Sequence, residues 1–347
     1  MSELFPVLDL RDAERGPLAR AAFLDRLRAA VHDIGFFQLV GHGVTGADEL
    51  LDLARRFFTL PEPQRAALSI LESPYFRGYS EVGRELTQGI PDQRRQLDIG
   101  PEQPLAVPGP DEPSYRWLAG PNQWPAGLPE LAPTVHRWTA DLTGVAHRLL
   151  GLILESLDTP ADFLDEVVAP EPHVHFKLLH YPGPAATAAA AATADRGGRG
   201  DDGSGQGVGV HKDYGLLTLL LQDDKGGLQV SLEDGVFLDV PVVPGAFVVN
   251  LGELLEVATR GYLRATTHRV VRPAPGVDRY SAPFFYNPRL DAAMQPLPSP
   301  FVSAAEGVVH DPANPLFAGY GENVMKGMLR AFPEVIARHH PELAPAR

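Results

Sequence analysis

Residues 209–224 read GVHKDYGLLTLLLQDD. The run from Leu216 to Leu221 is apolar apart from Thr218, which is the pattern of a buried β-strand. His211 and Asp213 stand at the entrance to this run. Because side chains two positions apart in a strand project from the same face, the imidazole and the carboxylate are predicted to lie side by side. The stretch therefore predicts a buried strand that begins with two candidate metal ligands.

The second half of the chain contains seven short strand candidates separated by turn residues. Turns such as DDKGG (223–227) and PVVPG (241–245) divide them. Many short strands with regular turns predict a β-sandwich or barrel. The candidates are residues 173–181, 216–222, 227–230, 236–240, 246–250, 265–271 and 280–287.

The first half is mainly helical or irregular. Apolar residues at helical spacing predict helices over 16–34, 47–58 and 131–158, and a further helix over 321–333 near the C-terminus. Strands are expected at 6–10 and 35–43, and residues 72–130 are expected to be irregular. We expect 1–160 to pack as an N-terminal helical and irregular region on a β-barrel core at 161–347, forming one compact unit. The Ala/Gly-rich segment 183–207 is predicted to be a mobile insertion.

Composition excludes several classes of protein. The 347 residues carry 30 basic and 44 acidic side chains, a formal net charge of −14, which argues against a nucleic-acid partner. There are no cysteines, so any metal site must use His, Asp and Glu. The sequence has no stretch of about 18 consecutive apolar residues, so no membrane span is expected. The first residues, MSELFPVLDL, lack the pattern of a signal peptide, so a cytoplasmic protein is expected.

A third candidate ligand, His268, lies in ATTHRVV, 55 residues after Asp213. Two histidines and one carboxylate on one face of a metal are the ligand set of non-haem Fe(II) oxygenases, which keep the remaining positions open. Arg279 and Ser281 follow, again two residues apart. A guanidinium beside a hydroxyl is suited to binding a carboxylate. A zinc hydrolase could use the same three ligands, but it would not explain the Arg–Ser pair.

These motifs resemble those of the isopenicillin N synthase-like Fe(II)/2-oxoglutarate-dependent dioxygenases. HKD at 211–213, the distant His268 and RYS at 279–281 match the HxD…H and RxS motifs of that family. The resemblance extends to PVLDL, GFFQLVGHG and RGYSEVG in the first half, and to GGLQV and the closing helix in the second.

The resemblance implies a mixed α/β fold with a mainly β core, a double-stranded β-helix (jelly-roll) barrel flanked by helices. His211, Asp213 and His268 would hold Fe(II). Arg279 and Ser281 would bind the distal carboxylate of 2-oxoglutarate, and Tyr181 would also contact this cosubstrate. Where the family often has a polar residue, this chain has Leu179. With O₂, the enzyme would oxidise an unactivated C–H bond by hydroxylation, desaturation or ring closure, releasing succinate and CO₂.

Candidate substrate residues are less tightly specified. Lys177 shares a strand face with Tyr181, and we expect it to meet either a carboxylate of a substrate or a salt-bridge partner. Aromatic and arginine residues of the 72–100 segment are expected to wall the active site, together with an apolar residue of the RYS strand; the candidates are Tyr75, Arg77, Arg84, Arg94 and Phe285. The expected substrate is a small molecule such as an amino acid or a natural-product intermediate. Two alternatives remain open at this stage: an iron oxidase of the same fold that takes no 2-oxoglutarate, and a catalytically inactive binding module.

Overall fold

The computed structural model describes residues 4–184, 206–233, 235–303, 305, 307–308 and 314–344. Most of the predicted insertion at 183–207 lies outside the described residues. Residues 183, 184, 206 and 207 of this segment are described, and the last two begin strand β8 (Gln206–His211).

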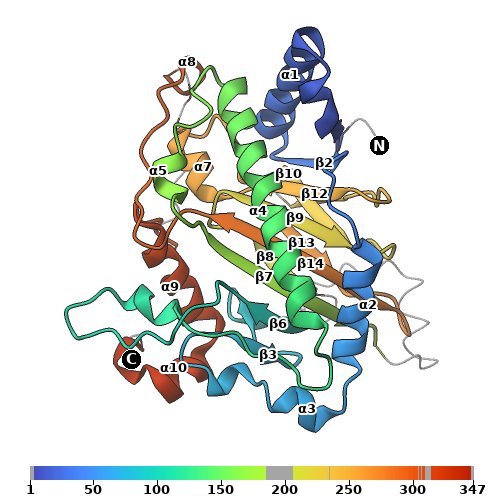
Figure 1. Ribbon diagram of the computed structural model, residues 1–347, viewed down its shortest axis with the longest axis vertical. Coiled ribbons are helices and arrows are strands. Elements are labelled where there is room, and N and C mark those ends of the chain that lie inside the picture. Colours follow the sequence, from blue (N-terminus) through green and yellow to red (C-terminus); the bar gives the residue numbers. More distant parts are fainter. Residues whose placement is uncertain are drawn as a thin grey trace.

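Two β-sheets lie at the centre of the molecule (Figure 1). The larger sheet has eight strands in the order β1-β2-β12-β9-β14-β7-β6-β3, and the smaller has four in the order β11-β10-β13-β8. Within these two sheets every described pair is antiparallel except β1 with β2. The remaining strands are β1 (Val7–Asp9), β2 (Phe36–Val40), β3 (Gly78–Ser80), β6 (Arg95–Ile99), β7 (His173–Pro182), β9 (Leu217–Gln222), β10 (Leu228–Glu233), β11 (Val236–Asp239), β12 (Phe247–Leu251), β13 (His268–Val271) and β14 (Asp278–Asn287). A separate hairpin pairs β4 (Leu86–Thr87) with β5 (Ile90–Pro91).

Helices surround the sheets. The long helix α4 (Leu131–Ser156) crosses the larger sheet, and α9 (Tyr320–Ala331) and α10 (Pro333–His339) close the chain (Figure 1). No helix in the described ranges combines the length and apolarity needed to cross a membrane. The others are α1 (Pro17–Asp33), α2 (Ala47–Phe58), α3 (Glu62–Ala66), α5 (Asp165–Val168), α7 (Glu253–Ala258) and α8 (Pro300–Ser303), with 3₁₀ turns η1 (Leu10–Glu14), η2 (Ile70–Glu72), η3 (Ser114–Leu118) and η4 (Pro341–Leu343).

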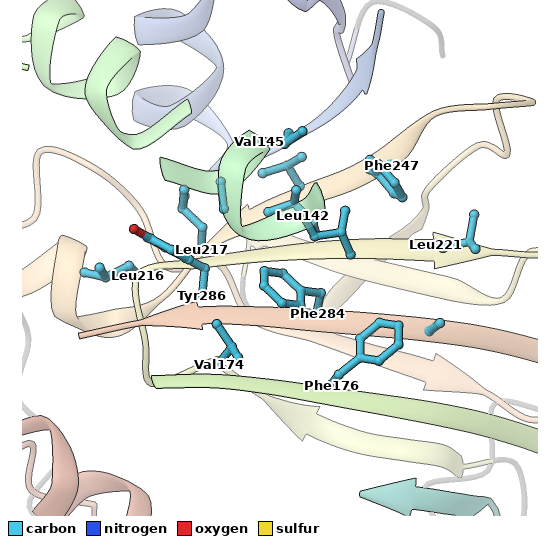
Figure 2. Packing of buried hydrophobic residues seen from close by; sticks show 14 of the residues in the cluster. Leu142, Val145, Val174, Phe176, Leu216, Leu217, Leu221, Phe247, Phe284 and Tyr286 are labelled. Atoms are coloured by element: carbon cyan, nitrogen blue, oxygen red, sulfur yellow. The ribbon is translucent and has the colours of Figure 1, made fainter. Parts of the chain in front are cut away.

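The main hydrophobic core lies between α4 and one face of the larger sheet (Figure 2). Leu142 and Val145 of α4 belong to the same buried cluster as Phe176, Leu217 and Phe284 from three neighbouring strands. Burying each such side chain stabilises the fold by about 1.5–3 kcal/mol relative to exposure. Since strand side chains alternate, the residues between these face the other way, towards the interior of the barrel.

The opposite face of the larger sheet carries the polar residues. On β7 it presents His173, His175, Lys177, Leu179 and Tyr181, all of them buried. Their common face follows from the alternation in HVHFKLLHY, as the sequence predicts. The helical layer and the sheet therefore leave one polar inner surface for chemistry.

The structure confirms helix 47–58 residue for residue as α2, and helix 131–158 as α4 with an end two residues earlier. The prediction that 72–130 is wholly irregular was wrong. Strand β6 pairs antiparallel with β7, and β3 extends the sheet beyond it. Helix α7 was not predicted, because its six residues are too few to establish a helical period.

Candidate metal centre and cosubstrate site

Three predicted ligands meet at one end of the smaller sheet. His211 ends β8 and His268 begins β13, and the two are direct partners across the antiparallel pair. Asp213 follows in the next loop, with its Oδ1 3.7 Å from His211 Nε2 and 3.8 Å from His268 Nε2. The three candidate ligand atoms all lie within 4.8 Å of one another, and no other such group of His, Asp or Glu occurs among the described residues.

The backbone orients both imidazoles. His211 Nδ1 lies 2.8 Å from the carbonyl oxygen of Gly209, and His268 Nδ1 lies 3.0 Å from that of Thr266. Each Nδ1–H therefore donates a hydrogen bond to a backbone carbonyl, which leaves the lone pair of Nε2 facing the space between the three side chains. Burial, together with the neighbouring His211, lowers the pKa of His268 to about 4, so its ring is neutral and able to bind a metal at neutral pH.

The carboxylate of Asp213 is held with one oxygen free. Its Oδ2 accepts hydrogen bonds from Thr218 Oγ1 at 2.6 Å and from Asn250 Nδ2 at 2.7 Å, which leaves Oδ1 directed at the histidines. Burial alone would raise the pKa of Asp213, but His268 and His211 lower it below its ordinary value. Two imidazoles and one carboxylate, converging from one side, fit Fe(II) with its remaining positions open.

A single carboxylate, Glu256 of α7, joins the two segments that carry the ligands. Its Oε2 accepts a hydrogen bond at 2.9 Å from Nζ of Lys212, the residue between His211 and Asp213 in the chain. Its Oε1 accepts from the backbone N–H of Ala265 at 3.1 Å, just before β13. Glu256 therefore fixes the spacing of segments that are far apart in the chain.

Arg279 occupies the inner face of β14 and is only 1% exposed. Its Nη1 donates to Ser281 Oγ at 3.2 Å and its Nη2 to Gln222 Oε1 at 3.2 Å, while its Nε donates to the Gly226 carbonyl at 2.5 Å. The guanidinium also lies 4.8 Å from the ring centroid of Tyr181. The predicted group of Arg279, Ser281 and Tyr181 is thus brought together, and within the described residues the guanidinium has no acidic partner.

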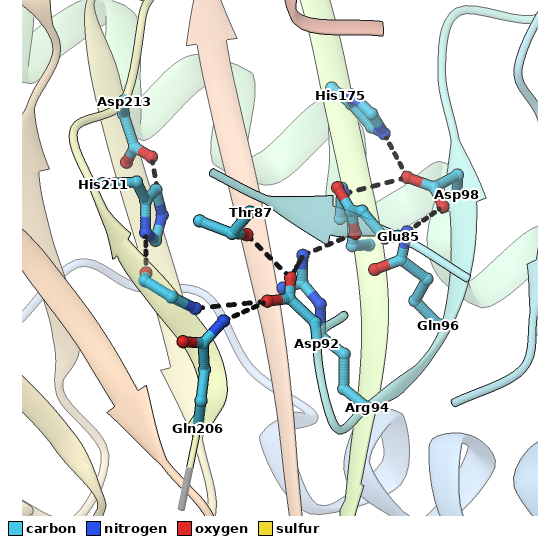
Figure 3. A network of polar contacts seen from close by, with 12 residues as sticks. Glu85, Thr87, Asp92, Arg94, Gln96, Asp98, His175, Gln206, His211 and Asp213 are labelled. Carbon is cyan, nitrogen blue, oxygen red and sulfur yellow. Dashed lines mark hydrogen bonds and ion pairs between the residues drawn. The ribbon is translucent and has the colours of Figure 1, made fainter. Parts of the chain in front are cut away.

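A network of buried charges extends from the ligand-bearing strand towards β6 and β7 (Figure 3). Asp92 accepts a hydrogen bond from the backbone N–H of Gly209 at 3.2 Å. The carbonyl of the same Gly209 accepts the hydrogen bond from His211 Nδ1. Arg94 then pairs with Asp92 at 3.3 Å and with Glu85 at 2.5 Å. Burial alone would lower the pKa of Arg94, but Glu85 and Asp92 raise it, so it remains charged.

The far end of the network closes on Asp98 of β6. Its Oδ1 lies 3.2 Å from Lys177 Nζ and 3.0 Å from His175 Nε2, and its Oδ2 accepts from Gln96 at 2.7 Å. Lys177 also lies 3.1 Å from Glu85. Lys177 is therefore paired on both sides by acids of the chain, which is the salt-bridge alternative of the prediction.

The β4–β5 hairpin lies against β8. Gln88 at its tip donates from Nε2 to the carbonyl of Val210 at 3.0 Å, next to His211. Thr87 donates a hydrogen bond to Asp92 at 2.9 Å, and so orients the carboxylate that accepts the hydrogen bond from the Gly209 N–H. The N-terminal part of the chain thus supports the metal centre directly.

The remaining substrate candidates lie in different places. Arg84 is exposed and pairs with Glu334 of α10. Tyr75 packs against Gly120 and is half-buried. Phe285 is half-buried on the inner face of β14, with its ring centroid 5.8 Å from that of His175. Arg77 is fully buried, as described below.

Several residues of the site were missed by sequence reasoning. Glu85 and Asp98 lie in a segment that was expected to be irregular, and Asn250 was assigned only to a buried strand. The available signal was the alternation of RQLDI, in which Gln96 and Asp98 are two residues apart, as in the metal-binding pair.

Comparison with known proteins adds to this geometry. Residues 5–127 match the model described as the non-haem dioxygenase in morphine synthesis N-terminal region, and residues 196–288 match the 2OG-Fe(II) oxygenase superfamily. A 2-oxoglutarate-dependent dioxygenase of Dothideomycetidae sp. is 34% identical over 299 residues, which cover 85% of this chain and 77% of that protein. The chain belongs to the 2OG-Fe(II) oxygenase superfamily. An Arabidopsis thaliana homoarginine-6-hydroxylase is 31% identical, covering 80% of each chain.

Solved structures agree with this superfamily assignment. A putative 2OG-Fe(II) oxygenase family protein of Caulobacter crescentus is 26% identical with a TM-score of 0.70, covering 94% of this chain and 98% of that one. A Neurospora crassa protein in complex with alpha-KG, 24% identical, shares the fold with a TM-score of 0.73, covering 94% and 96%. The predicted jelly-roll fold, the dependence on Fe(II) and 2-oxoglutarate, and the oxidoreductase class are confirmed.

Proposed function

We propose that this 2OG-Fe(II) oxygenase hydroxylates an unactivated C–H bond of a small organic molecule. One oxygen atom of O₂ enters the product and the other enters succinate, with CO₂ released from 2-oxoglutarate. The observation that carries the proposal is the convergence of His211, Asp213 and His268, together with the buried Arg279 on the inner face of β14. Relatives named as homoarginine-6-hydroxylases support hydroxylation over desaturation or ring closure.

Each residue has a defined part in the proposal. His211 Nε2, Asp213 Oδ1 and His268 Nε2 would hold Fe(II), which supplies redox chemistry and open positions for the cosubstrates. Arg279 would bind the distal carboxylate of 2-oxoglutarate, since no acid of the described residues pairs with its guanidinium, and Ser281 lies beside it. Tyr181 and Leu179, 1% and 3% exposed, would keep that end of the site free of water.

The experiment is anaerobic addition of Fe(II) and 2-oxoglutarate, followed by O₂ and candidate small molecules. We expect a visible absorption band when 2-oxoglutarate binds, and succinate release that matches hydroxylated product one to one. Asp213→Ala should lose both. Oxygen consumption without succinate, or Fe(II) binding that survives in Asp213→Ala, would overturn the proposal.

A further inference from the structure

We propose that Arg77 binds a carboxylate of the organic substrate, so that the substrate is an organic acid held at the opposite end of the site from 2-oxoglutarate. This inference rests on the proposed function and extends it to the class of substrate. It comes from the unusual state of one buried guanidinium.

Arg77 is 2% exposed, and its charged group is almost without partners in the part of the chain that the structure describes. Its side chain makes one hydrogen bond, from Nη2 to the carbonyl of Leu118 at 3.2 Å, and its Nε is buried with no acceptor. No acid lies within ion-pair distance of it among those residues. A guanidinium has five N–H donors, so most of the hydrogen-bonding capacity of Arg77 is unused.

Two other buried arginines show what is missing. Arg65 is 9% exposed, and its side chain donates to the carbonyls of Phe58 and Leu60 and to the Tyr79 hydroxyl. It is thus satisfied as a structural residue. Arg279 instead lacks an acid and is the residue expected to receive a ligand carboxylate. Arg77 resembles Arg279 in this respect, and it has still fewer partners.

The guanidinium of Arg77 lies over Gly100, directly after β6. A Cβ on Gly100 would overlap the Arg77 guanidinium, and Asn122 holds this glycine through hydrogen bonds to both its N–H and its carbonyl, each at 2.9 Å. The position of the charge is therefore built by the surrounding backbone.

This position adjoins the inner surface of β7. Gly100 lies two residues after Asp98 of β6, and Asp98 Oδ1 is 3.0 Å from His175 Nε2 on that surface. On β14, the residue opposite His173 is Asn287, which packs against Gly215, two residues after Asp213. Arg77 therefore lies beside the inner surface that leads to the candidate iron ligands, at the end of β7 away from Tyr181 and Arg279.

Among the described residues, no acid pairs with Arg77, and the two acids that act on it are held by other groups. Asp98 is bonded to His175, Lys177 and Gln96, and Glu102 accepts hydrogen bonds from Asn122. Burial lowers the pKa of Arg77 to about 10, against an ordinary value of 12.5, yet the group stays protonated at neutral pH. A buried, protonated and unpaired guanidinium is costly, and a planar carboxylate that can accept two hydrogen bonds would relieve this cost.

The first test separates a ligand-binding arginine from a structural one without any substrate. We expect Arg77→Met to leave the melting temperature of the metal-free protein unchanged or raised, because an unpaired charge is replaced by an apolar chain. The matched control Arg65→Met should lower the melting temperature by ~5 °C. An equal loss in Arg77→Met would assign Arg77 a structural role and overturn the inference.

The second test uses small carboxylic acids, including L-homoarginine, phenylacetate and N-acetyl-L-leucine, each paired with its primary amide. Stimulation of succinate release by the Fe(II)-loaded wild type should favour an acid over its amide by ~100-fold in half-saturating concentration. Arg77→Met should abolish this preference, and Gly100→Ala, which displaces the guanidinium, should weaken it. Equal action of acids and amides, a preference that survives in Arg77→Met, or no response to any acid would overturn the inference. The visible band of wild-type protein with 2-oxoglutarate tests the proposed function separately.

Discussion

Replacing Lys177 by methionine should destabilise the protein strongly, because Lys177 neutralises two buried acids. Its Nζ lies 3.1 Å from Glu85 and 3.2 Å from Asp98, and none of the three side chains is more than 13% exposed. Removing one member of a buried ion pair typically costs about 3–5 kcal/mol. Arg94 still pairs with Glu85 and His175 still contacts Asp98, so we expect a loss of ~3 kcal/mol in the free energy of unfolding.

Urea unfolding of the metal-free protein at pH 7 measures this loss. The control is Lys225→Met, whose side chain is 43% exposed and pairs with the 80% exposed Asp224; it should change the free energy of unfolding by less than ~0.5 kcal/mol.

The loss in Lys177→Met should also depend on pH. Burial alone would raise the pKa of Asp98, but Lys177 and His175 hold it below its ordinary value of 3.8. A lowered carboxyl pKa stabilises the fold above the unfolded-state pKa, and this stabilisation disappears as the pH falls through the folded-state pKa. Wild type should therefore lose more stability in acid than the variant, and the difference between them should narrow below about pH 4.

Two results would refute this reasoning. A loss below ~1 kcal/mol at pH 7 would mean that Lys177 does not neutralise the network, and would return it to the role of a substrate anchor. A difference that widens in acid would show that Asp98 is not the carboxylate that Lys177 stabilises.

Other predictions concern the ligands and the core. Asn250→Ala, which removes one of the two hydrogen bonds to Asp213 Oδ2, should weaken Fe(II) binding by about 10–100-fold in a metal titration, with thermal unfolding as the control for folding. Glu256→Gln keeps the shape of its bridge but loses the charge, and should weaken Fe(II) binding less than Glu256→Ala does; equal binding in wild type and both variants would contradict a positioning role. Leu142→Ala should cost about 2–5 kcal/mol in urea unfolding, whereas Leu18→Ala, at a residue 90% exposed, should cost almost nothing.

The metal ligands and the main helices could be predicted from the sequence because each has a strong local signal. HKD at the start of an apolar strand determines the face that the ligands share, and the period of residues 131–158 determines α4. His268 required a long-range step, since only the pairing of β13 with β8 brings it opposite His211.

The polar network could not be predicted, because its members are joined by tertiary contacts alone. Asp98 sits in a five-residue strand within a Pro- and Gly-rich segment, where propensity gives little information. Lys177 was recognised as a buried lysine in need of an anion, but the sequence did not reveal that Glu85 and Asp98 supply that anion. The state of Arg77 likewise depends on Gly100 and Asn122, which lie 23 and 45 positions further along the chain.

The contact between the β4–β5 hairpin and β8 limits how such enzymes can be recombined. Gln88 and Asp92 hold the backbone of Val210 and Gly209, and Gly209 in turn orients the imidazole of His211. A chimera that takes its barrel from one relative and its N-terminal half from another would combine a β4–β5 hairpin and a β8 strand from different proteins, so these hydrogen bonds would join residues of different origin. Residues 81–95 and 206–213 should therefore be exchanged together, as one cassette, when specificity is transplanted between members of the superfamily.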